Sequence, residues 1–385
     1  MKCRKRAAVI AAAVLMLVPL HCEAAEPECS AAAAVVMEAS TRQVLLEKHG
    51  NERHSMASTT KIMTALLALE SERLNEPVTI TDAMTRTEGS SIYLKPGDRL
   101  TLYGLVVGLM LESGNDAALA IAITLDGSEA AFVARMNRRA ADLGMTGTHF
   151  VTASGLDDDA HYTTARDMAL LGCAAMESPE FAAIVSKQTA SVDFLSPAVQ
   201  RTFYNHNRLL RDLDWCIGVK TGFTKKSGRC LVSCCERDGV RMVAVTLNAP
   251  DDWNDHRQLM HRAFEMTEPI LLTGDGLNVQ LPVVGGAAES AVLTAAGAVR
   301  AVIPSGRSDA VEMRIETEPF LYAPVMPGRT AGCVSYWLDD RCVGEISLLT
   351  ASEIPYMRRT RTGWERMVDF LARLFGFRSE SANIS

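Results

Sequence analysis

The sequence predicts an α/β protein in which helices pack with a mainly antiparallel sheet, followed by a small all-β domain and a C-terminal amphipathic helix. Three observations support this fold class. Strand-type apolar runs stand at both ends of residues 31–247, and helix-type periodicity fills the middle. From residue 277 onward the chain has short β-type runs separated by Gly and Pro. An apolar stripe at helical spacing returns near the C-terminus.

The overall composition is that of an ordinary globular protein. The chain has 385 residues, enough for two domains, with 48% hydrophobic and 22% charged residues. Its net charge of −7 and the lack of any RNA- or DNA-binding motif argue against a nucleic-acid partner. The Cys and His residues have no metal-site spacing, so we expect neither a metal nor a cofactor.

Residues 1–25 are predicted to be a signal peptide. A basic start that includes Lys2 and Arg4 precedes an apolar run of 14 residues, 7–20, which is too short to span a bilayer comfortably. We expect cleavage after Ala24 or Ala25 and a mature protein that works outside the cytoplasm, on the outer face of the cytoplasmic membrane. A retained N-terminal anchor is the alternative.

The first elements of the mature chain are two strands and a helix. Residues 31–37 form an apolar run typical of a buried strand, and residues 42–47 form its partner after a turn at Ser40-Thr41. A helix is predicted over 57–70. Its apolar positions recur at i, i+3, i+4 and i+7, at Ile62, Ala65, Leu66 and Leu69.

Further helices are predicted in the middle of the chain, over 100–111, 117–125 and 130–143. The acidic loop after residue 155 then leads into another helix near Asp167.

Residues 215–247 have the pattern of a β-meander. Strands are predicted over 215–221, 229–236 and 240–247, and Asp238-Gly239 has the composition of a two-residue hairpin turn. A helix over 255–266 closes this first domain, whose bounds we set at 26–270.

A second, β-rich domain is predicted over 277–352. Its strands are expected at 279–284, 298–303, 310–316 and 332–338.

Residues 358–378 are predicted to form a helix that associates with a membrane surface. The apolar positions Trp364 and Leu371 fall on one helical face with four others, and six Arg stand against two acidic residues. A basic helix with a Trp/Phe/Leu face is typical of an interfacial helix. A helix that docks on its own protein or on a partner is the alternative.

Eight cysteines follow the signal peptide. Cys333 and Cys342 flank an expected hairpin and are candidates for a disulfide. Four others, at 216, 230, 234 and 235, fall on expected neighbouring strands, and the sequence leaves their pairing open.

The most informative stretch is Ser58-Thr59-Thr60-Lys61. A 3.6-residue period puts Ser58 and Lys61 one turn apart on the same face, so a hydroxyl nucleophile lies beside a candidate base. Alone, the pattern is equally that of a helix cap and a solvated lysine.

Two later motifs change that interpretation. Ser113-Gly114-Asn115 stands between two expected helices, and Lys220-Thr221-Gly222 stands at the end of an expected strand. Each alone is typical of an ordinary helix end or strand exit. Together, in this order, they resemble the active-site motifs of penicillin-recognising serine enzymes.

The resemblance is greatest to the low-molecular-mass penicillin-binding proteins, the D-alanyl-D-alanine carboxypeptidases, and it extends over about residues 32–268. Further similar stretches are 41–45, 115–118, 155–168, 205–210 and 218–231. It implies a β-lactamase/transpeptidase-like fold for the first domain. It also implies a serine peptidase that removes the terminal D-Ala from peptidoglycan pentapeptide stems through an acyl-enzyme, with β-lactams as covalent inhibitors.

The resemblance also implies residue roles. Ser58 is the expected nucleophile, Lys61 its base, and Ser113 passes a proton toward the leaving amine. Asn115 holds the substrate amide and helps to fix Lys61. The substrate carboxylate is assigned to Lys220 and Thr221. Gly222 is expected to let the substrate backbone approach, and the backbone N–H groups of Ser58 and Phe223 form the oxyanion hole.

Other interpretations of the same residues remain. A β-lactamase of class A needs a Glu-x-x-Leu-Asn loop, but Ser71 stands where that Glu belongs before Leu74-Asn75. A DD-endopeptidase would use the same serine site, and a non-catalytic peptidoglycan-binding protein has no need of all six motif side chains. His161, Arg166 and Asp167 are predicted to be structural and not a catalytic triad.

Overall fold

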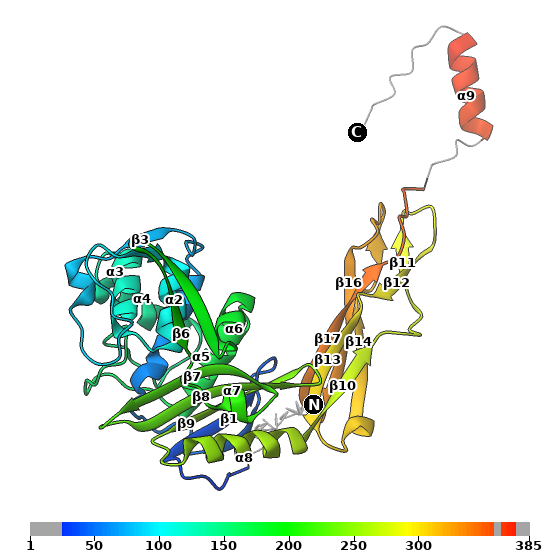
Figure 1. Ribbon diagram of the computed structural model, residues 1–385. Helices are drawn as coiled ribbons and strands as arrows, with labels where there is room; N and C mark the ends of the chain where they lie inside the picture. Colours follow the sequence, from blue (N-terminus) through cyan, green and yellow to red (C-terminus); the bar gives the residue numbers. More distant parts are fainter. Residues whose placement is uncertain (1–24, 358–362, 375–385) are drawn as a thin grey trace, which may run out of the picture. The chain divides into compact units, whose positions relative to one another are not determined.

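The computed structural model describes residues 25–357 and 363–374, and the chain divides into two compact units, one ending at Ala263 and the other beginning at Phe264 (Figure 1). The expected signal peptide lies outside the described residues except for Ala25. The expected C-terminal helix is described over Gly363–Leu374 as α9.

The first unit is built on one antiparallel sheet of five strands, in the order β2-β1-β9-β8-β7. This confirms the predicted α/β class. The strands are β1 (Ala33–Glu38), β2 (Val44–Lys48), β7 (Cys216–Thr224), β8 (Gly228–Arg237) and β9 (Val240–Leu247).

Helices cover both faces of this sheet. Helix α5 (Ala165–Met176) packs against β1, β8 and β9 on one face. On the other face lies α8 (Asp252–Glu265), whose His256 contacts the hydroxyls of Ser233 and Thr246 at 2.6 and 2.9 Å (Figure 1). Because β1 is buried at every residue, its sequence is a continuous apolar run and does not alternate.

The helix predicted over 57–70 is two elements. A 3₁₀ turn, η1 (Ala57–Thr60), leads into α1 (Lys61–Leu69). Residues 61–68 are all buried, because α1 packs against α2, α3, α5 and α6. The apolar residues at helical spacing therefore do not mark α1 as an amphipathic helix with one buried and one exposed face. Instead, α1 is a central helix of the unit and is buried on all sides.

Of the remaining helices of this unit, α2, α3, α4 and α6 contact α1, and the short α7 contacts β7. The helix predicted from residue 100 begins at Leu102, because residues 99–101 form strand β4 and the Thr101 hydroxyl caps the helix. The helices are α2 (Leu102–Leu111), α3 (Asn115–Asp126), α4 (Glu129–Asp142), α6 (Pro179–Val185) and α7 (Leu209–Asp212).

Two small hairpins complete the unit, together with a 3₁₀ turn, η2 (Asp82–Thr85). They are β3 (Pro77–Thr79) with β4 (Arg99–Thr101), and β5 (Thr189–Leu195) with β6 (Ala198–Tyr204).

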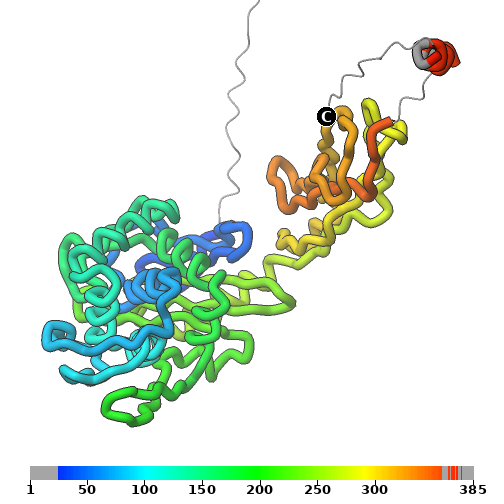
Figure 2. The backbone as a smooth tube through the Cα atoms, turned by 90° about the horizontal axis from the view of Figure 1, so that it is seen from above, coloured from blue at the N-terminus to red at the C-terminus, as the bar shows by residue number. Residues whose placement is uncertain are grey.

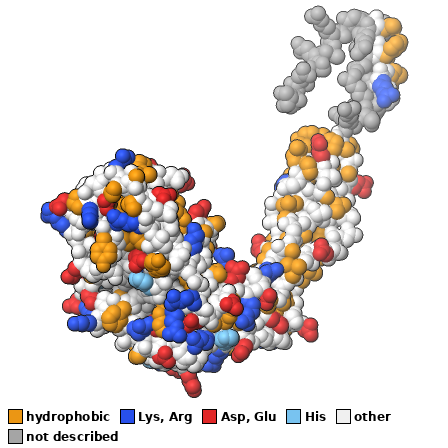
Figure 3. Space-filling view, viewed as in Figure 1, with side chains coloured by type: hydrophobic (Ala, Val, Ile, Leu, Met, Phe, Trp, Pro, Cys, Tyr) orange, Lys and Arg blue, Asp and Glu red, His pale blue; other side chains and the backbone are white. Residues whose placement is uncertain are grey.

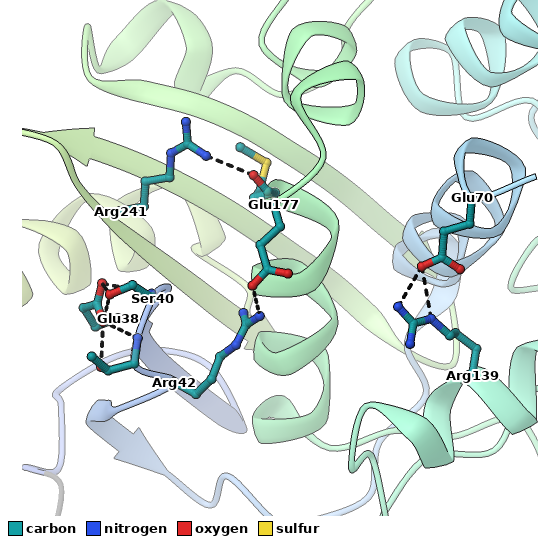
Figure 4. Close-up of polar contacts among 9 residues, drawn as sticks. Glu38, Ser40, Arg42, Glu70, Arg139, Glu177 and Arg241 are labelled. Carbon is teal, nitrogen blue, oxygen red and sulfur yellow. Dashed lines mark hydrogen bonds and ion pairs between the residues drawn. The ribbon is translucent and has the colours of Figure 1, made fainter. Parts of the chain in front are cut away.

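Polar contacts join the ends of these elements (Figure 4). The buried Glu38 carboxylate accepts hydrogen bonds from the backbone and hydroxyl groups of Ser40 and Thr41, which forms the turn between β1 and β2. Arg139 of α4 forms an ion pair of 2.7 Å with Glu70 at the end of α1. These contacts fix the turns while the apolar core holds the layers.

Residues 267–350 of the second unit form an all-β domain, as predicted. Its main sheet has six strands in the order β14-β16-β17-β12-β11-β15, and β10 pairs with β13. Figure 2 shows the backbone of this domain in yellow to orange. The strands are β10 (Thr267–Thr273), β11 (Val279–Val284), β12 (Ser290–Ala295), β13 (Ala298–Pro304), β14 (Val311–Thr317), β15 (Leu321–Tyr322), β16 (Thr330–Leu338) and β17 (Arg341–Thr350). A 3₁₀ turn, η3 (Ser308–Ala310), precedes β14.

Cys333 and Cys342, the two candidates for a disulfide, are not joined in the structure. Both thiols are free, and the β16–β17 register pairs Cys333 with Ser347 and Cys342 with Trp337. The tight turn after Leu338 sets this register, so the two cysteines do not stand opposite each other.

Among the described residues, no single helix is both long and apolar enough to cross a membrane; α3 with α4 and α5 with α6 meet that test only as bent pairs.

Candidate active site

The site is built where η1 meets strand β7. Gly222 of β7 lies close to that turn, because a Cβ there would lie 3.1 Å from the Met56 carbonyl oxygen and 3.2 Å from the Ser58 nitrogen. A side chain at this position would be tight against the turn that carries Ser58, so the glycine lets strand and turn approach closely. The predicted role of Gly222 in admitting the substrate backbone stays a prediction.

Lys61 is buried and directed at Ser58. Its Nζ donates hydrogen bonds of 2.8 Å to the Ser58 hydroxyl and 2.6 Å to the Ser154 carbonyl oxygen. Asn115 was expected to fix Lys61, but in the described part of the chain no hydrogen bond joins these two side chains. The Asn115 amide donates instead to the Glu88 carbonyl, at 2.6 Å.

The two lysines of the site have depressed pKa values. Burial, and then the positive charge of Lys220, lower the pKa of Lys61 well below its usual value, against an opposing effect of Asp116. Burial lowers the pKa of Lys220 to about 7. The lowered pKa favours the neutral form of the Lys61 amine, which is the form that can accept a proton.

Ser113 stands on the connection between α2 and α3 with φ of +62°, a left-handed conformation that is rare for a residue with a side chain. Asp116, the second residue of α3, accepts hydrogen bonds from the backbone N–H groups of Ile92 and Leu94 and from the Ser91 hydroxyl. This buried carboxylate ties residues 90–94 to the start of α3, beside Ser113.

The Lys-Thr-Gly motif was expected at the end of a strand, but β7 continues through it to Thr224. Lys220 points into the protein and donates to the Thr221 carbonyl oxygen at 3.0 Å. Phe223 is 65% exposed and lies at the rim.

These elements enclose a cleft of about 300 Å³. The predicted site residues fall into two groups: Ser58, Ser113, Thr221, Gly222 and Phe223 line the cleft, and Lys61, Asn115 and Lys220 are buried. Five further residues line it that the prediction did not assign to the site: Ser90, His206, Arg229, Asp252 and Trp253.

Four of those further residues come from segments that are distant in the sequence and meet in the folded chain. Arg229, at the start of β8, is paired with Asp252 at 2.8 Å and lies over the Trp253 ring. His206 lies 3.4 Å from Glu112, the residue before Ser113. Asp252 is buried, so Arg229 is held in place as a cation at the cleft.

His161 is buried and structural, in agreement with its predicted role. Its Nδ1 accepts a hydrogen bond from the Val151 N–H, so Nε2 carries the proton and donates to the Thr60 hydroxyl at 2.8 Å. The Thr60 hydroxyl then donates to the Ala57 carbonyl. Burial lowers the pKa of His161 to about 4, so the ring stays neutral and braces the turn before Ser58.

The side chains of Arg166 and Asp167, which follow His161 in the sequence, have partners that do not belong to the cleft. Asp167 accepts hydrogen bonds from the Gly147 N–H and the Thr148 hydroxyl, and Arg166 pairs with Glu47.

The comparisons with known proteins agree with this geometry. Residues 21–251 match the family model described as D-alanyl-D-alanine carboxypeptidase, and residues 267–356 match that of the penicillin-binding protein 5 C-terminal domain. The chain is 32% identical over 348 residues to D-alanyl-D-alanine carboxypeptidase DacC of Escherichia coli, covering 85% of each. It is 29% identical to DacF of Bacillus subtilis, covering 87% of this chain and 90% of that one.

Solved structures show the same likeness. Penicillin-binding protein 5 from Haemophilus influenzae matches with a TM-score of 0.68 and 27% identity, over 86% of this chain and 98% of that one. The Streptomyces K15 DD-transpeptidase matches with a TM-score of 0.59 and 31% identity, over 62% of this chain and 98% of that one. With both of its domains matched, this chain belongs to the D-alanyl-D-alanine carboxypeptidase family of serine peptidases, in the penicillin-binding protein 5 group.

Proposed function

We propose that this enzyme removes the terminal D-Ala from peptidoglycan pentapeptide stems with Ser58 as nucleophile, and that β-lactams inhibit it by acylating Ser58. The observation that carries the proposal is the 2.8 Å hydrogen bond from Lys61 Nζ to the Ser58 hydroxyl. It joins a nucleophile at the wall of a cleft to a buried amine whose pKa is well below its usual value.

In the first step, Ser58 Oγ attacks the carbonyl carbon of the penultimate D-Ala, and its proton passes to Lys61 Nζ. The peptide bond to the terminal D-Ala breaks, and Ser113 passes a proton to the departing amine. Water then hydrolyses the ester on Ser58, with Lys61 again as base. The motif order and the shared cleft support these roles.

Substrate binding is assigned to the motif on β7. The Thr221 hydroxyl and the Lys220 ammonium bind the terminal carboxylate, and Asn115 contacts the substrate amide. A carboxylate that enters next to Lys220 raises the pKa of that lysine from about 7 and so favours its charged form. The Ser58 and Phe223 N–H groups stabilise the oxyanion. The close approach of β7 to η1 at Gly222 supports this last role.

The enzyme works on the outer face of the cytoplasmic membrane, with α9 lying on the membrane surface. A basic n-region and an apolar run at the N-terminus support export. The described residues of α9 include exposed apolar side chains such as Trp364, Phe370 and Leu374, which support an interfacial position.

A labelling experiment tests the catalytic proposal. Wild-type protein is expected to form a covalent adduct with labelled penicillin and to release D-Ala from a pentapeptide that ends in D-Ala-D-Ala. Ser58→Ala abolishes both, and Ser55→Ala, three residues earlier, retains both. Wild-type protein without any label would contradict the acyl-enzyme, and label without D-Ala release would favour a DD-endopeptidase.

A further inference from the structure

The second unit carries a group of exposed apolar side chains at one end. We call this group the tip, and it consists of Val284, Phe320, Tyr322, Met326, Tyr356 and Met357. The strand pairing brings these side chains together: Val284 of β11 stands beside Tyr322 of β15, and Tyr356 bridges to Gly286. Figure 3 shows hydrophobic side chains gathered at the end of the second unit where β11 is labelled in Figure 1.

The tip side chains are exposed to an unusual degree for their size. Tyr322, Tyr356 and Met357 are each 65% exposed, and Met326 is 57% exposed. Single exposed apolar residues are common on soluble proteins, but a contiguous group of six marks a contact surface. Phe320 and Tyr322 also stack edge to face at 5.2 Å, so the patch is ordered before anything covers it.

The tip is also the place from which the chain continues to α9. The Met357 N–H donates to the Gly285 carbonyl at 2.8 Å, which fixes the last described residue of this segment to the tip. Residues 358–362 then lead to Gly363, the first residue of α9. Because consecutive Cα atoms are about 3.8 Å apart at most, six steps reach roughly 20 Å. Whatever surface α9 binds therefore lies within reach of the tip.

The charge of the segment between the tip and α9 indicates which kind of surface α9 binds. The connecting residues 358–362 read Arg-Arg-Thr-Arg-Thr, and Glu353 is the one acidic residue in 351–357. Apolar and tyrosine side chains next to an arginine cluster suit the boundary between anionic lipid headgroups and acyl chains. A protein surface of the same size has no comparable need for three arginines within four residues of the sequence.

We propose that the tip is a second membrane-contact site, which inserts its apolar side chains into the same anionic lipid surface that α9 occupies. The inference rests on the proposed membrane attachment of α9 and deepens it. The 12 described residues of α9 offer a limited apolar surface, and the strength of interfacial binding scales with the apolar area that is buried in the lipid. The tip supplies further apolar area and fixes which end of the second unit faces the lipid.

Vesicle sedimentation tests the proposal with the mature full-length protein and vesicles of phosphatidylcholine mixed with anionic phosphatidylglycerol. The test variant is Tyr322→Ser with Met357→Ser, two exposed tip positions. Its matched control is Leu271→Ser with Met313→Ser, which are 65% and 48% exposed but lie on β10 and on β14, the edge strand opposite β15. A third protein ends at Met357 and lacks α9.

The tip variant is expected to lower the vesicle partition coefficient about five- to twentyfold, since it removes two large apolar contacts. The control variant stays at the wild-type value, and penicillin labelling is unchanged in all three proteins. A tip variant that binds vesicles like wild type overturns the inference while leaving α9 as the anchor. Unchanged binding of the protein without α9 instead removes the proposed role of the helix.

A second copy of the chain is the competing occupant of the tip. Sedimentation velocity without vesicles distinguishes the two occupants. A dimer of the wild-type protein, together with a monomer of the tip variant, would overturn the membrane assignment. A monomer for both proteins, together with the loss of vesicle binding, supports it.

Discussion

The carbonyl oxygen of Ala57 occupies the position where a side chain on Gly155 would begin: a Cβ on Gly155 would lie 2.0 Å from it. Gly155 belongs to the segment that follows Ser154, whose carbonyl holds Lys61, and Ala57 directly precedes Ser58. The contact therefore connects the environment of the base with the turn that carries the nucleophile.

Gly155→Ala is expected to cost both stability and activity. Its φ of +87° disfavours any side chain by about 1–2 kcal/mol, and the clash with Ala57 adds to that. Gly144→Ala is the matched control, because Gly144 has φ of +77° but nothing within 4 Å of its Cβ position. Urea unfolding and penicillin-acylation rates measure both effects. Equal losses in the two variants would show that the contact with Ala57 has no role.

Lys61→Met is expected to slow penicillin acylation by about 10³-fold, because the general base is lost. The same change raises the free energy of unfolding near pH 7, since burial makes the lysine a costly group to enclose. Chemical denaturation and labelling kinetics measure the two effects. The exposed Lys225, changed to Met, serves as control and should alter neither. A Lys61→Met protein that is less stable than wild type would argue against a strongly depressed pKa.

Lys220 predicts a pH dependence of stability with a defined sign. Its pKa is about 7 in the folded protein and 10.5 as the ordinary value, so the unfolded chain binds more protons between these limits. The free energy of unfolding therefore rises with pH across that interval, by up to about 1.4 kcal/mol per unit. Urea unfolding at pH 7, 8 and 9 measures the slope, and Lys220→Met should reduce it, with the buried Lys61 contributing the remainder. The same slope in wild type and variant would disprove the assignment.

The same two lysines predict a bell-shaped profile of kcat/KM. The acid limb follows Lys61, which must be neutral to act as base, and the alkaline limb follows Lys220, which must be charged to bind the substrate carboxylate. A penicillin derivative esterified at its carboxylate should lose the alkaline limb and keep the acid one. If both limbs persist with the ester, Lys220 does not act through the carboxylate.

Glu38 and Glu70 provide a contrast between two carboxylates. Glu38 is 2% exposed and accepts hydrogen bonds from two backbone N–H groups and two hydroxyls, so Glu38→Gln is expected to cost about 1–3 kcal/mol. Glu70→Gln loses a half-exposed ion pair with Arg139 and is expected to cost about 1 kcal/mol or less. Thermal unfolding compares the two variants. A larger loss at Glu70 would contradict this ranking.

The chemistry of the site could be predicted from sequence because it depends on side-chain types at fixed spacings, as with Ser58 and Lys61. The partner that fixes Lys61 could not, since a backbone carbonyl such as that of Ser154 has no residue-type signal. Arg229 was missed for a different reason. Its place at the cleft depends on the pairing of β8 and on the start of α8, both distant in the sequence from Ser58.

The fold class could be predicted from the periodicity of apolar residues, but the degree to which each helix is buried could not. The stripe from Ile62 to Leu69 predicted a helix correctly, yet periodicity cannot tell that neighbouring helices cover its remaining faces. The pairing of Cys333 and Cys342 stayed open in the sequence for a similar reason: they lie on adjacent strands, but a bulge and a tight turn set which residues stand opposite. Local sequence patterns specify helices and strands. The register between strands and the burial of a helix depend on packing between segments that are distant in the sequence.

The burial of α1 restricts where the sequence beside the proposed nucleophile can vary. From Ile62 to Ala68 every residue is part of the core, so substitutions there are expected to damage the fold. If β-lactams acylate Ser58 as proposed, variants that escape the drug and persist in a population are expected instead at exposed positions of the cleft. Phe223, which lines the cleft and is 65% exposed, can change without loss of core packing. Selection for resistance would therefore act on the rim of the cleft, while the helix that follows the Ser58 turn stays constrained.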